Sequence, residues 1–292
     1  MAVSGQGGAR EGSDDPAVER LLEDLRAKCG LKRDELLARK IAGVLRQCAA
    51  GERDAWVGDL VARPPGDPGW LAFVEAVTVH ETYFFRDPAQ LAVLGEVILP
   101  ALLEARAAAG RRVLRVWSAG CASGEEAYSV AMLVLDAIAA RGETPRDWEV
   151  AILGSDISRA ILAQARQGIY GGPGLNAFRR MPARQERHFV ALEGAQAGLR
   201  RISGELSAMA SFCQHNLMDA APPQAGFDIA LCRNVFIYFD DAAQKRAVAT
   251  LHRGLVEGGH LLLGVTDRLA PGCGFAREPC GTAVIYRREA AP

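Results

Sequence analysis

Residues 113–131 decide the fold, and they read Val113-Leu-Arg-Val-Trp-Ser-Ala-Gly-Cys-Ala-Ser-Gly-Glu-Glu-Ala-Tyr-Ser-Val-Ala131. The apolar run Val113–Ser118 ends at a turn that contains Gly120 and Gly124, and the helical pattern of Glu125–Ala140 follows it. A strand that leads through a glycine turn into a helix is typical of the first half of a βαβ unit. Glycines in such a turn let the backbone approach a ligand closely, so the stretch predicts a ligand-binding turn at the end of a parallel strand.

The charges of this turn indicate which kind of ligand it binds. The pattern is not Gly-x-Gly-x-x-Gly, and Glu125 and Glu126 would repel a pyrophosphate at the N-terminus of the helix. S-adenosylmethionine carries an ammonium and a sulfonium group and no phosphate, so it suits the turn better. The alternative is an ordinary glycine turn without a ligand, which many α/β proteins have at this place.

The pattern of strand and helix continues outward from this unit. Asp156 ends the next apolar run, Val150–Ser155, where an acid can accept hydrogen bonds from both hydroxyls of a ribose; alternatively it caps the helix that follows. Alternating apolar runs and helical stretches predict an α/β fold with a mostly parallel sheet. Its further strands are expected at 227–233 and 260–265, its further helices at 159–167 and 241–256, and a terminal antiparallel hairpin at 275–278 and 282–287.

Two more stretches carry polar residues where a ligand would lie. Arg233 and Asn234 end the strand at 227–233, and ligands bind at the carboxyl ends of parallel strands. Tyr238 follows them and is expected to reach the same crevice, or else to be a packed aromatic residue. The stretch His80-Glu-Thr-Tyr-Phe-Phe-Arg-Asp87 joins the N-terminal helical region to the α/β region. Packing between domains explains its aromatic residues but explains Arg86 poorly.

The N-terminal region is predicted to be helical. Residues 1–15 read as a disordered tail, and helices are expected at 17–28 and 32–48. On a helical wheel one face of the second helix is basic, and it either docks an acidic partner or is an ordinary solvated face. The basic face consists of Lys32, Arg33, Arg39, Lys40 and Arg46. A second basic stretch, at 179–201, suggests a small β excursion from the main sheet.

Composition excludes several classes of protein. The chain has 292 residues, of which 49% are hydrophobic and 24% charged, and its formal net charge is -1. These values exclude a disordered chain, a collagen and a nucleic-acid-binding polycation. No apolar run approaches the roughly 20 residues that span a bilayer, and the N-terminal sequence predicts no signal peptide. The seven cysteines are scattered without a Cys-x-x-Cys motif, so we expect free thiols in a reducing cytoplasm and no structural metal.

Taken together and in this order, the four stretches resemble the chemotaxis receptor methyltransferases, the CheR family, over roughly residues 18 to 288. The resemblance implies an S-adenosylmethionine-dependent class I methyltransferase domain, Rossmann-like and seven-stranded, at 81–292. It also implies a small all-α N-terminal domain at 16–80 and an antiparallel β subdomain at about 189–212, which in some members grips a peptide at the C-terminus of the receptor. By motif, the residues that line the cofactor are His80, Thr82, Arg86, Ala119, Glu125, Asp156, Asn216, Leu217, Arg233 and Asn234.

The activity that the resemblance implies is protein-glutamate O-methylation on the cytoplasmic helices of chemoreceptors. The catalytic residues are then Arg86, which balances the acceptor carboxylate, and Tyr238, the family's tyrosine nearest the methyl group. Three alternatives stay open: a non-catalytic adaptor that binds S-adenosylmethionine, a methyltransferase for another signalling protein, and a nicotinamide oxidoreductase on a similar fold. Against the oxidoreductase, the sequence lacks the phosphate-binding loop that a nicotinamide cofactor would need.

Overall fold

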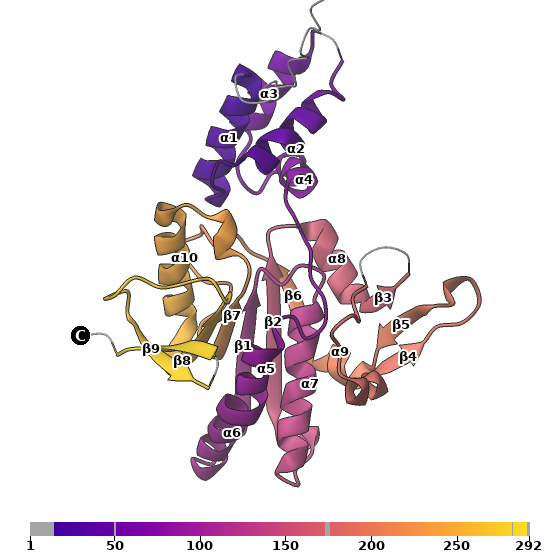
Figure 1. The fold of residues 1–292 in the computed structure, drawn as a ribbon, viewed down its shortest axis with the longest axis vertical. Coiled ribbons are helices and arrows are strands. Elements are labelled where there is room, and N and C mark those ends of the chain that lie inside the picture. The colour runs from indigo at the N-terminus through magenta and orange to yellow at the C-terminus, as the bar shows by residue number, and fades with distance from the viewer. Residues whose placement is uncertain (1–14, 50, 173–175, 282, 291–292) are drawn as a thin grey trace, which may run out of the picture. The chain divides into compact units, whose positions relative to one another are not determined.

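The computed structural model describes residues 15–49, 51–172, 176–281 and 283–290, so the tail expected at 1–15 lies almost wholly outside the described residues. The chain divides into two compact units. The helical unit contains the residues up to Val79 together with Tyr238–Ala243, and the sheet unit contains His80–Ile237 and the residues from Gln244 onward (Figure 1). Among the described residues, no helix combines the length and the apolar character needed to cross a bilayer.

Aspartate caps set the helices of the helical unit. The side chain of Asp34 accepts a hydrogen bond from the backbone N–H of Leu37 at 2.8 Å, so the second helix begins at Glu35 and ends at Leu45. The prediction of a helix over 32–48 was therefore too long at both ends. The helices are α1 (Pro16–Cys29), α2 (Glu35–Leu45), α3 (Arg53–Ala62) and α4 (Pro68–Val77). Their core contains the fully buried side chains of Leu21, Leu25, Ile41 and Trp70.

A short segment from far along the chain completes the helical unit. The backbone N–H of Lys32 donates to the carbonyl oxygen of Tyr238 at 2.7 Å, and Leu31 forms an antiparallel bridge with Phe239. The Arg26 guanidinium lies 2.6 Å from the Asp240 carboxylate. Sequence patterns had assigned residues 238–243 to the methyltransferase domain, because nothing local signals these long-range partners.

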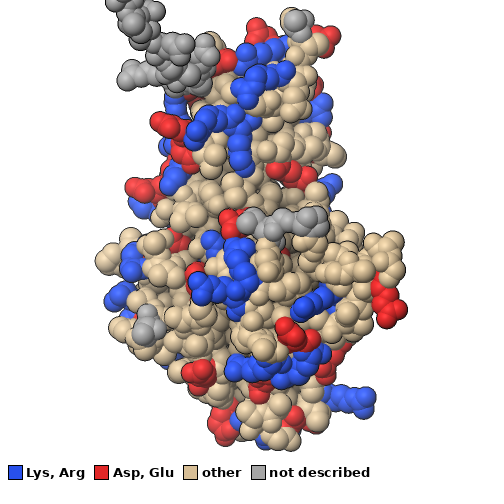
Figure 2. Space-filling model, turned by 45° about the vertical axis from the view of Figure 1, so that its right-hand side comes forward, with Lys and Arg blue, Asp and Glu red and all other residues tan. Residues whose placement is uncertain are grey.

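The basic side chains of the helical unit differ in their exposure and in their bonding partners. Lys32, Arg39 and Arg46 are exposed, whereas Arg33 lies 2.5 Å from Glu19 in an ion pair. Lys40 donates to the carbonyl oxygen of Thr78 at 2.6 Å, and burial lowers the pKa of its ammonium group. The upper part of Figure 2 shows Lys and Arg side chains gathered on this unit.

A seven-stranded sheet in the order β6-β2-β1-β7-β8-β10-β9 forms the centre of the sheet unit. The first five strands of that order are parallel to one another, and β10 runs antiparallel to both β8 and β9. This is the class I arrangement that was predicted. The strands are β1 (Val113–Ala119), β2 (Glu149–Asp156), β6 (Ala210–Gln214), β7 (Phe227–Cys232), β8 (Leu255–Leu263), β9 (Phe275–Cys280) and β10 (Ala283–Arg288).

Helices cover the sheet with apolar faces. Twelve of the sixteen residues of α7 are buried, and all six residues of β7 are buried, as expected for a parallel strand covered on both sides. One core cluster joins α5, α6 and α7 to β1, β2 and β7. The helices of this unit are α5 (Pro88–Val93), a π-helical turn at Leu94–Ile98, α6 (Leu99–Ala108), α7 (Glu125–Ala140), α8 (Arg159–Gln167), α9 (Gly204–Met209) and α10 (Asp241–Gly254), whose first turn lies in the segment 238–243.

Two expected boundaries differ from the structure. Helix α10 ends at Gly254 and β8 begins at once, so the strand expected at 260–265 is longer at its start and ends at Leu263. The small antiparallel sheet has the order β3-β5-β4, with β3 (Ile169–Gly171), β4 (Phe189–Ala191) and β5 (Leu199–Ile202). The strands of the small sheet thus lie between 169 and 202, whereas the β subdomain was expected at 189–212. Residues 210–214 form β6, which pairs with β2 in the main sheet instead. The predicted terminal hairpin is present, with Thr282 outside the described residues.

Candidate functional site

The glycine turn after β1 folds back onto the end of β2. The backbone N–H groups of Gly120 and Cys121 both donate to the carbonyl oxygen of Ser155, at 2.7 and 2.9 Å. Gly120 has a φ of 75°, and a Cβ atom there would lie 2.5 Å from Cγ2 of Val235. No other residue fits without displacing a neighbour. Ala119, which ends β1, is fully buried beside this turn.

Asp156 ends β2 and is almost buried, with 8% of its surface exposed. Its Oδ2 atom accepts from the N–H of Ala122 and its Oδ1 atom from the N–H of Ser158, both at 3.0 Å. Ser158 is the residue that caps α8, since its hydroxyl accepts from Ile161 at 3.1 Å. Burial raises the pKa of the Asp156 carboxyl, and attraction to His80 opposes part of that rise. A carboxylate has about four acceptor sites, so beside the backbone groups of Ala122, Ser158 and Ile157 this one keeps capacity for a further donor.

Glu125 and Glu126 are neighbours in sequence with different surroundings. Glu126 lies 3.1 Å from Nη1 of Arg233 and accepts from the Ser118 hydroxyl at 2.6 Å. Glu125 is 4% exposed and accepts from the Ser123 hydroxyl at 2.7 Å, and burial raises the pKa of its carboxyl. Among the described residues, no Lys or Arg forms an ion pair with Glu125. A buried carboxylate in this situation suits a cationic ligand.

The side chain of Arg233 is 1% exposed and all its nitrogens have partners within the protein. Its Nε atom donates to Oε1 of Gln90 at 2.9 Å, and Nη1 reaches Glu126. Its Nη2 atom donates to the carbonyl oxygen of Arg86 and lies 3.3 Å from Oδ2 of Asp87. The guanidinium thus joins the end of β7 to the start of α7 and to the turn at 85–87. The predicted contact of Arg233 and Asn234 with the cofactor stays a prediction; Asn234 has a left-handed φ of 60°.

The turn that carries Arg86 is strained and firmly held. Phe85 and Asp87 have φ angles of 56° and 53°, which non-glycine residues rarely adopt. The N–H of Phe85 donates to the hydroxyl of Ser129 at 3.0 Å, which ties the turn to α7. Phe84 is fully buried among Tyr170, Phe178 and Phe189. The guanidinium of Arg86 is half-buried outside that aromatic core and donates to the carbonyl oxygen of Glu81 at 2.8 Å.

The remaining predicted residues divide between the two units. His80 and Thr82 are half-buried at the start of the sheet unit. Asn216 and Leu217 follow β6, and the preceding N–H, that of His215, donates to the carbonyl oxygen of Asp156 at 3.0 Å. Tyr238 is half-buried and belongs to the segment 238–243 of the helical unit. The sheet unit thus carries every predicted cofactor residue, and Tyr238 is carried by the helical unit.

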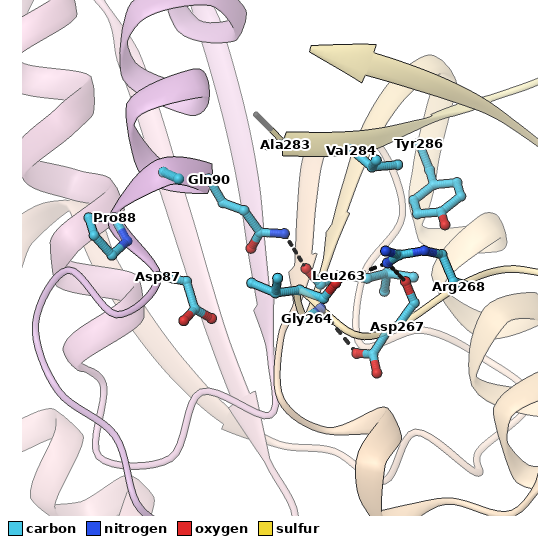
Figure 3. Close-up of a pocket in the computed structure, with 12 residues that line it drawn as sticks. Asp87, Pro88, Gln90, Leu263, Gly264, Asp267, Arg268, Ala283, Val284 and Tyr286 are labelled. Atoms are coloured by element: carbon cyan, nitrogen blue, oxygen red, sulfur yellow. Dashed lines mark hydrogen bonds between the residues drawn. The ribbon is translucent and has the colours of Figure 1, made fainter. Parts of the chain in front are cut away.

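Sequence patterns missed Gln90. This residue is 6% exposed, and besides accepting from Arg233 it donates to the carbonyl oxygen of Leu263 at 2.7 Å. It lies at a pocket of about 340 Å³ at the carboxyl end of β8 (Figure 3). The sequence signal that could have found it is a single polar residue, Gln90, among the apolar residues of helix α5. The polar residues that line the pocket are Asp87, Gln90, Asp267, Arg268 and Tyr286.

These features fit S-adenosylmethionine. Asp156 offers acceptors for ribose hydroxyls, and Glu125 is a buried carboxylate that a bound ammonium or sulfonium group would neutralise. Asp156 ends β2, and Glu125 begins α7 directly after the turn that follows the neighbouring parallel strand β1, so both belong to the carboxyl edge of the sheet. Fold and site define the class of S-adenosylmethionine-dependent methyltransferases.

Comparison with known proteins gives the family. The family model "CheR methyltransferase, SAM binding domain" matches residues 80–276. The chain is 33% identical over 223 residues to a chemotaxis protein methyltransferase of Vibrio parahaemolyticus, a match that covers 74% of this chain and 75% of the relative. It is 32% identical over 241 residues to chemotaxis protein methyltransferase 1 of Pseudomonas aeruginosa, with 80% and 83% covered. The chain belongs to the CheR methyltransferase family, and its cofactor is S-adenosylmethionine.

Proposed function

We propose that this protein transfers a methyl group from S-adenosylmethionine to glutamate side chains on the cytoplasmic helices of chemoreceptors, as a protein-glutamate O-methyltransferase. The names of its relatives support a role in chemotaxis. The observation that carries the proposal is Arg86, a guanidinium outside the aromatic core on the turn at 85–87, which Arg233 joins to the first turn of α7. Such a cation suits an anionic acceptor rather than a neutral one.

We assign the cofactor contacts as follows. Asp156 accepts from the ribose hydroxyls, and Glu125 faces the cationic end of the ligand. The backbone at Ala119 and Gly120 is assigned to line the ligand at the end of β1. His80, Thr82, Asn216, Leu217, Arg233 and Asn234 complete the lining. When bound, the cofactor supplies an electrophilic methyl group on a sulfonium.

The acceptor needs no general base. A glutamate carboxyl has a reference pKa of about 4.3, so it is a carboxylate at neutral pH. The protein has to place that carboxylate about 3–3.5 Å from the methyl carbon, in line with the bond that breaks, and to exclude water. Arg86 attracts and orients the carboxylate, and Tyr238 is assigned to orient the reacting centre. The product is a neutral ester, so its attraction to Arg86 falls after the reaction and release is favoured.

We assign receptor docking to the helical unit. The exposed cations Lys32, Arg39 and Arg46 suit a partner whose helices carry acidic methylation sites. Exposed ion pairs are worth only about 0.2–1 kcal/mol each, so this surface acts mainly on encounter rate and register. The small sheet is a second candidate contact, for a peptide at the receptor C-terminus.

Methyl transfer to a receptor fragment tests the proposal. With radiolabelled cofactor, the fragment should gain label that mild base releases as methanol, because methyl esters hydrolyse readily. Arg86→Ala and Tyr238→Phe should lower the turnover number strongly and change the free energy of unfolding only slightly. Cofactor binding by calorimetry without any transfer would favour the adaptor instead. Full single-turnover transfer by Tyr238→Phe would show that its hydroxyl has no part in the reaction.

A further inference from the structure

Arg86 shares its partners with a second arginine, Arg179. The guanidinium carbon of Arg179 lies 3.6 Å from the ring centroid of Tyr83, and that of Arg86 lies 5.7 Å from the same centroid. Both arginines also bond to Glu81. Arg179 reaches its carboxylate at 2.6 Å, and Arg86 donates to its backbone carbonyl oxygen at 2.8 Å. Two guanidinium groups therefore meet at one tyrosine ring and one glutamate.

The segment of Arg179 is fixed to the segment of Arg86 at further points. The N–H of Phe84 donates to the carbonyl oxygen of Ala177 at 2.9 Å, and the ring of Phe178 stacks on that of Phe84 at 5.4 Å. On the other side, the guanidinium of Arg200 in β5 lies 4.9 Å from the ring of Phe178. A continuous set of contacts thus runs from the small sheet to the Arg86 turn.

We propose that Arg179 is a positioning residue for methyl transfer, acting through Tyr83 and Glu81 to fix the guanidinium of Arg86. The proposal rests on the proposed function for its kinetic consequence. The Arg86 guanidinium donates to the carbonyl oxygen of Glu81, which lies on a segment without helix or strand, and the arginine side chain is long and rotatable. Holding Tyr83 and Glu81 in place removes much of that freedom, which is what an in-line reaction needs.

The charges of this group also define the kind of acceptor. Arg179 pairs with the carboxylate of Glu81, whereas Arg86 bonds only to the backbone carbonyl oxygen of Glu81, so the positive charge of Arg86 is not neutralised by that carboxylate alone. The excess of positive charge favours an acceptor that arrives as an anion and leaves as a neutral ester. A neutral acceptor, such as an amide or an alcohol, gains nothing from this arrangement.

Kinetics of matched variants test the positioning role. Arg179→Ala should lower kcat for the receptor fragment about tenfold, with unchanged affinity for S-adenosylhomocysteine by calorimetry. Arg179→Lys, which keeps the charge for Glu81 but loses the planar stack on Tyr83, should fall between. The neighbouring exposed Arg180 supplies the control, and Arg180→Ala should match wild type. In an Arg86→Ala background, Arg179→Ala should not lower kcat any further, because Arg179 acts through Arg86. Additive losses would overturn the proposal.

A second measurement does not depend on activity. Modification of Arg86 by phenylglyoxal, followed by peptide mass spectrometry, should become several-fold faster in Arg179→Ala and stay unchanged in Arg180→Ala. Equal rates in the two variants would overturn the positioning role. If wild type methylates no receptor fragment, the proposed function fails, and the modification rates still decide whether Arg179 fixes Arg86.

Discussion

The carboxylate of Glu126 lies 3.1 Å from Nη1 of Arg233, which bonds the first turn of α7 to the end of β7. The same guanidinium donates a hydrogen bond to the carbonyl oxygen of Arg86 and lies 3.3 Å from the Asp87 carboxylate. Three segments that are distant in sequence therefore meet at one buried cation. Arg233 acts as the structural centre of the site. Glu125, the residue before Glu126, forms no ion pair with a Lys or Arg among the described residues.

Arg233→Met should be strongly destabilising. It removes the counter-ion of two largely buried carboxylates, Glu126 and Asp87, and breaking a buried pair in this way costs about 3–5 kcal/mol. Denaturant unfolding followed by circular dichroism measures the loss. The double variant Arg233→Met/Glu126→Gln should recover part of it. Arg159→Ala, an exposed arginine bonded to Gln214, should change the stability by no more than about 0.5 kcal/mol. A small loss in Arg233→Met would contradict the role of Arg233 as the centre of the site.

In the ligand-free protein, Glu125→Gln should be more stable than wild type, and the difference in the free energy of unfolding should grow as the pH rises. The pKa of Glu125 is raised by burial, so between its unfolded and folded pKa values the native state binds more protons than the unfolded state. The free energy of unfolding contributed by Glu125 therefore falls with rising pH, starting near the unfolded value of about 4.3. Glutamine does not titrate, so the advantage of the variant should grow above that pH and level off above the folded pKa.

Denaturant titrations at several pH values between about 4 and 8 check this difference. The control is Glu149→Gln, which makes the same substitution at a side chain that is 68% exposed. Cofactor affinity should move the other way, because Glu125→Gln loses its attraction to the cationic ligand. A variant less stable than wild type at neutral pH would contradict the picture of Glu125 as an uncompensated buried charge.

Asp156→Ala should weaken binding of S-adenosylhomocysteine by a few kcal/mol. Two hydrogen bonds from the ribose to a charged group are lost, at about 1.5–3 kcal/mol each. Isothermal calorimetry gives the affinity, and circular dichroism verifies that the variant is folded. Asp156→Asn keeps one acceptor for the ribose and should lose less. Unchanged affinity in a folded Asp156→Ala protein would remove the ribose assignment.

Arg39→Glu/Arg46→Glu should raise KM for the receptor fragment and leave the cofactor affinity unchanged. Both side chains are exposed, whereas Lys40 bonds to the carbonyl oxygen of Thr78 and its reversal would disturb the fold. Wild type should lose efficiency in high salt, and the variant should be less sensitive to salt, because charges are screened within roughly 8 Å at physiological ionic strength. The matched control, Arg111→Glu/Arg146→Glu, makes the same change of net charge at exposed positions of the sheet unit. If the two double variants behave alike, the docking surface lies elsewhere.

Local signals predicted much of the fold. Helices α7 and α8 begin and end where the sequence predicts, because a glycine turn precedes α7, Ser158 caps α8 and Gly168 ends it in a left-handed conformation. The second helix was predicted too long because the cap at Asp34 was not recognised. Strand β8 was predicted too short at its start because the helix was expected to continue to 256, whereas α10 ends at Gly254 and the strand passes through Gly258 and Gly259.

The site was predictable in its motifs but not in its contacts. Glu125 and Glu126 look equivalent in sequence, and only the position of Arg233 in space distinguishes them. The partners of Arg233 are separated from it by more than one hundred residues along the chain, so no periodicity or spacing reveals them. Arg179 and Glu81 are 98 residues apart along the chain, and local patterns do not connect them either.

The segment 238–243 has a consequence for the order of events during synthesis. Arg26 and Asp240 are 214 residues apart along the chain, so the helices that leave the ribosome first lack part of their own unit until most of the sheet unit has been made. Closing so long a loop costs entropy that only the later contacts repay. The helical unit is therefore expected to reach its full stability last, although it is translated first.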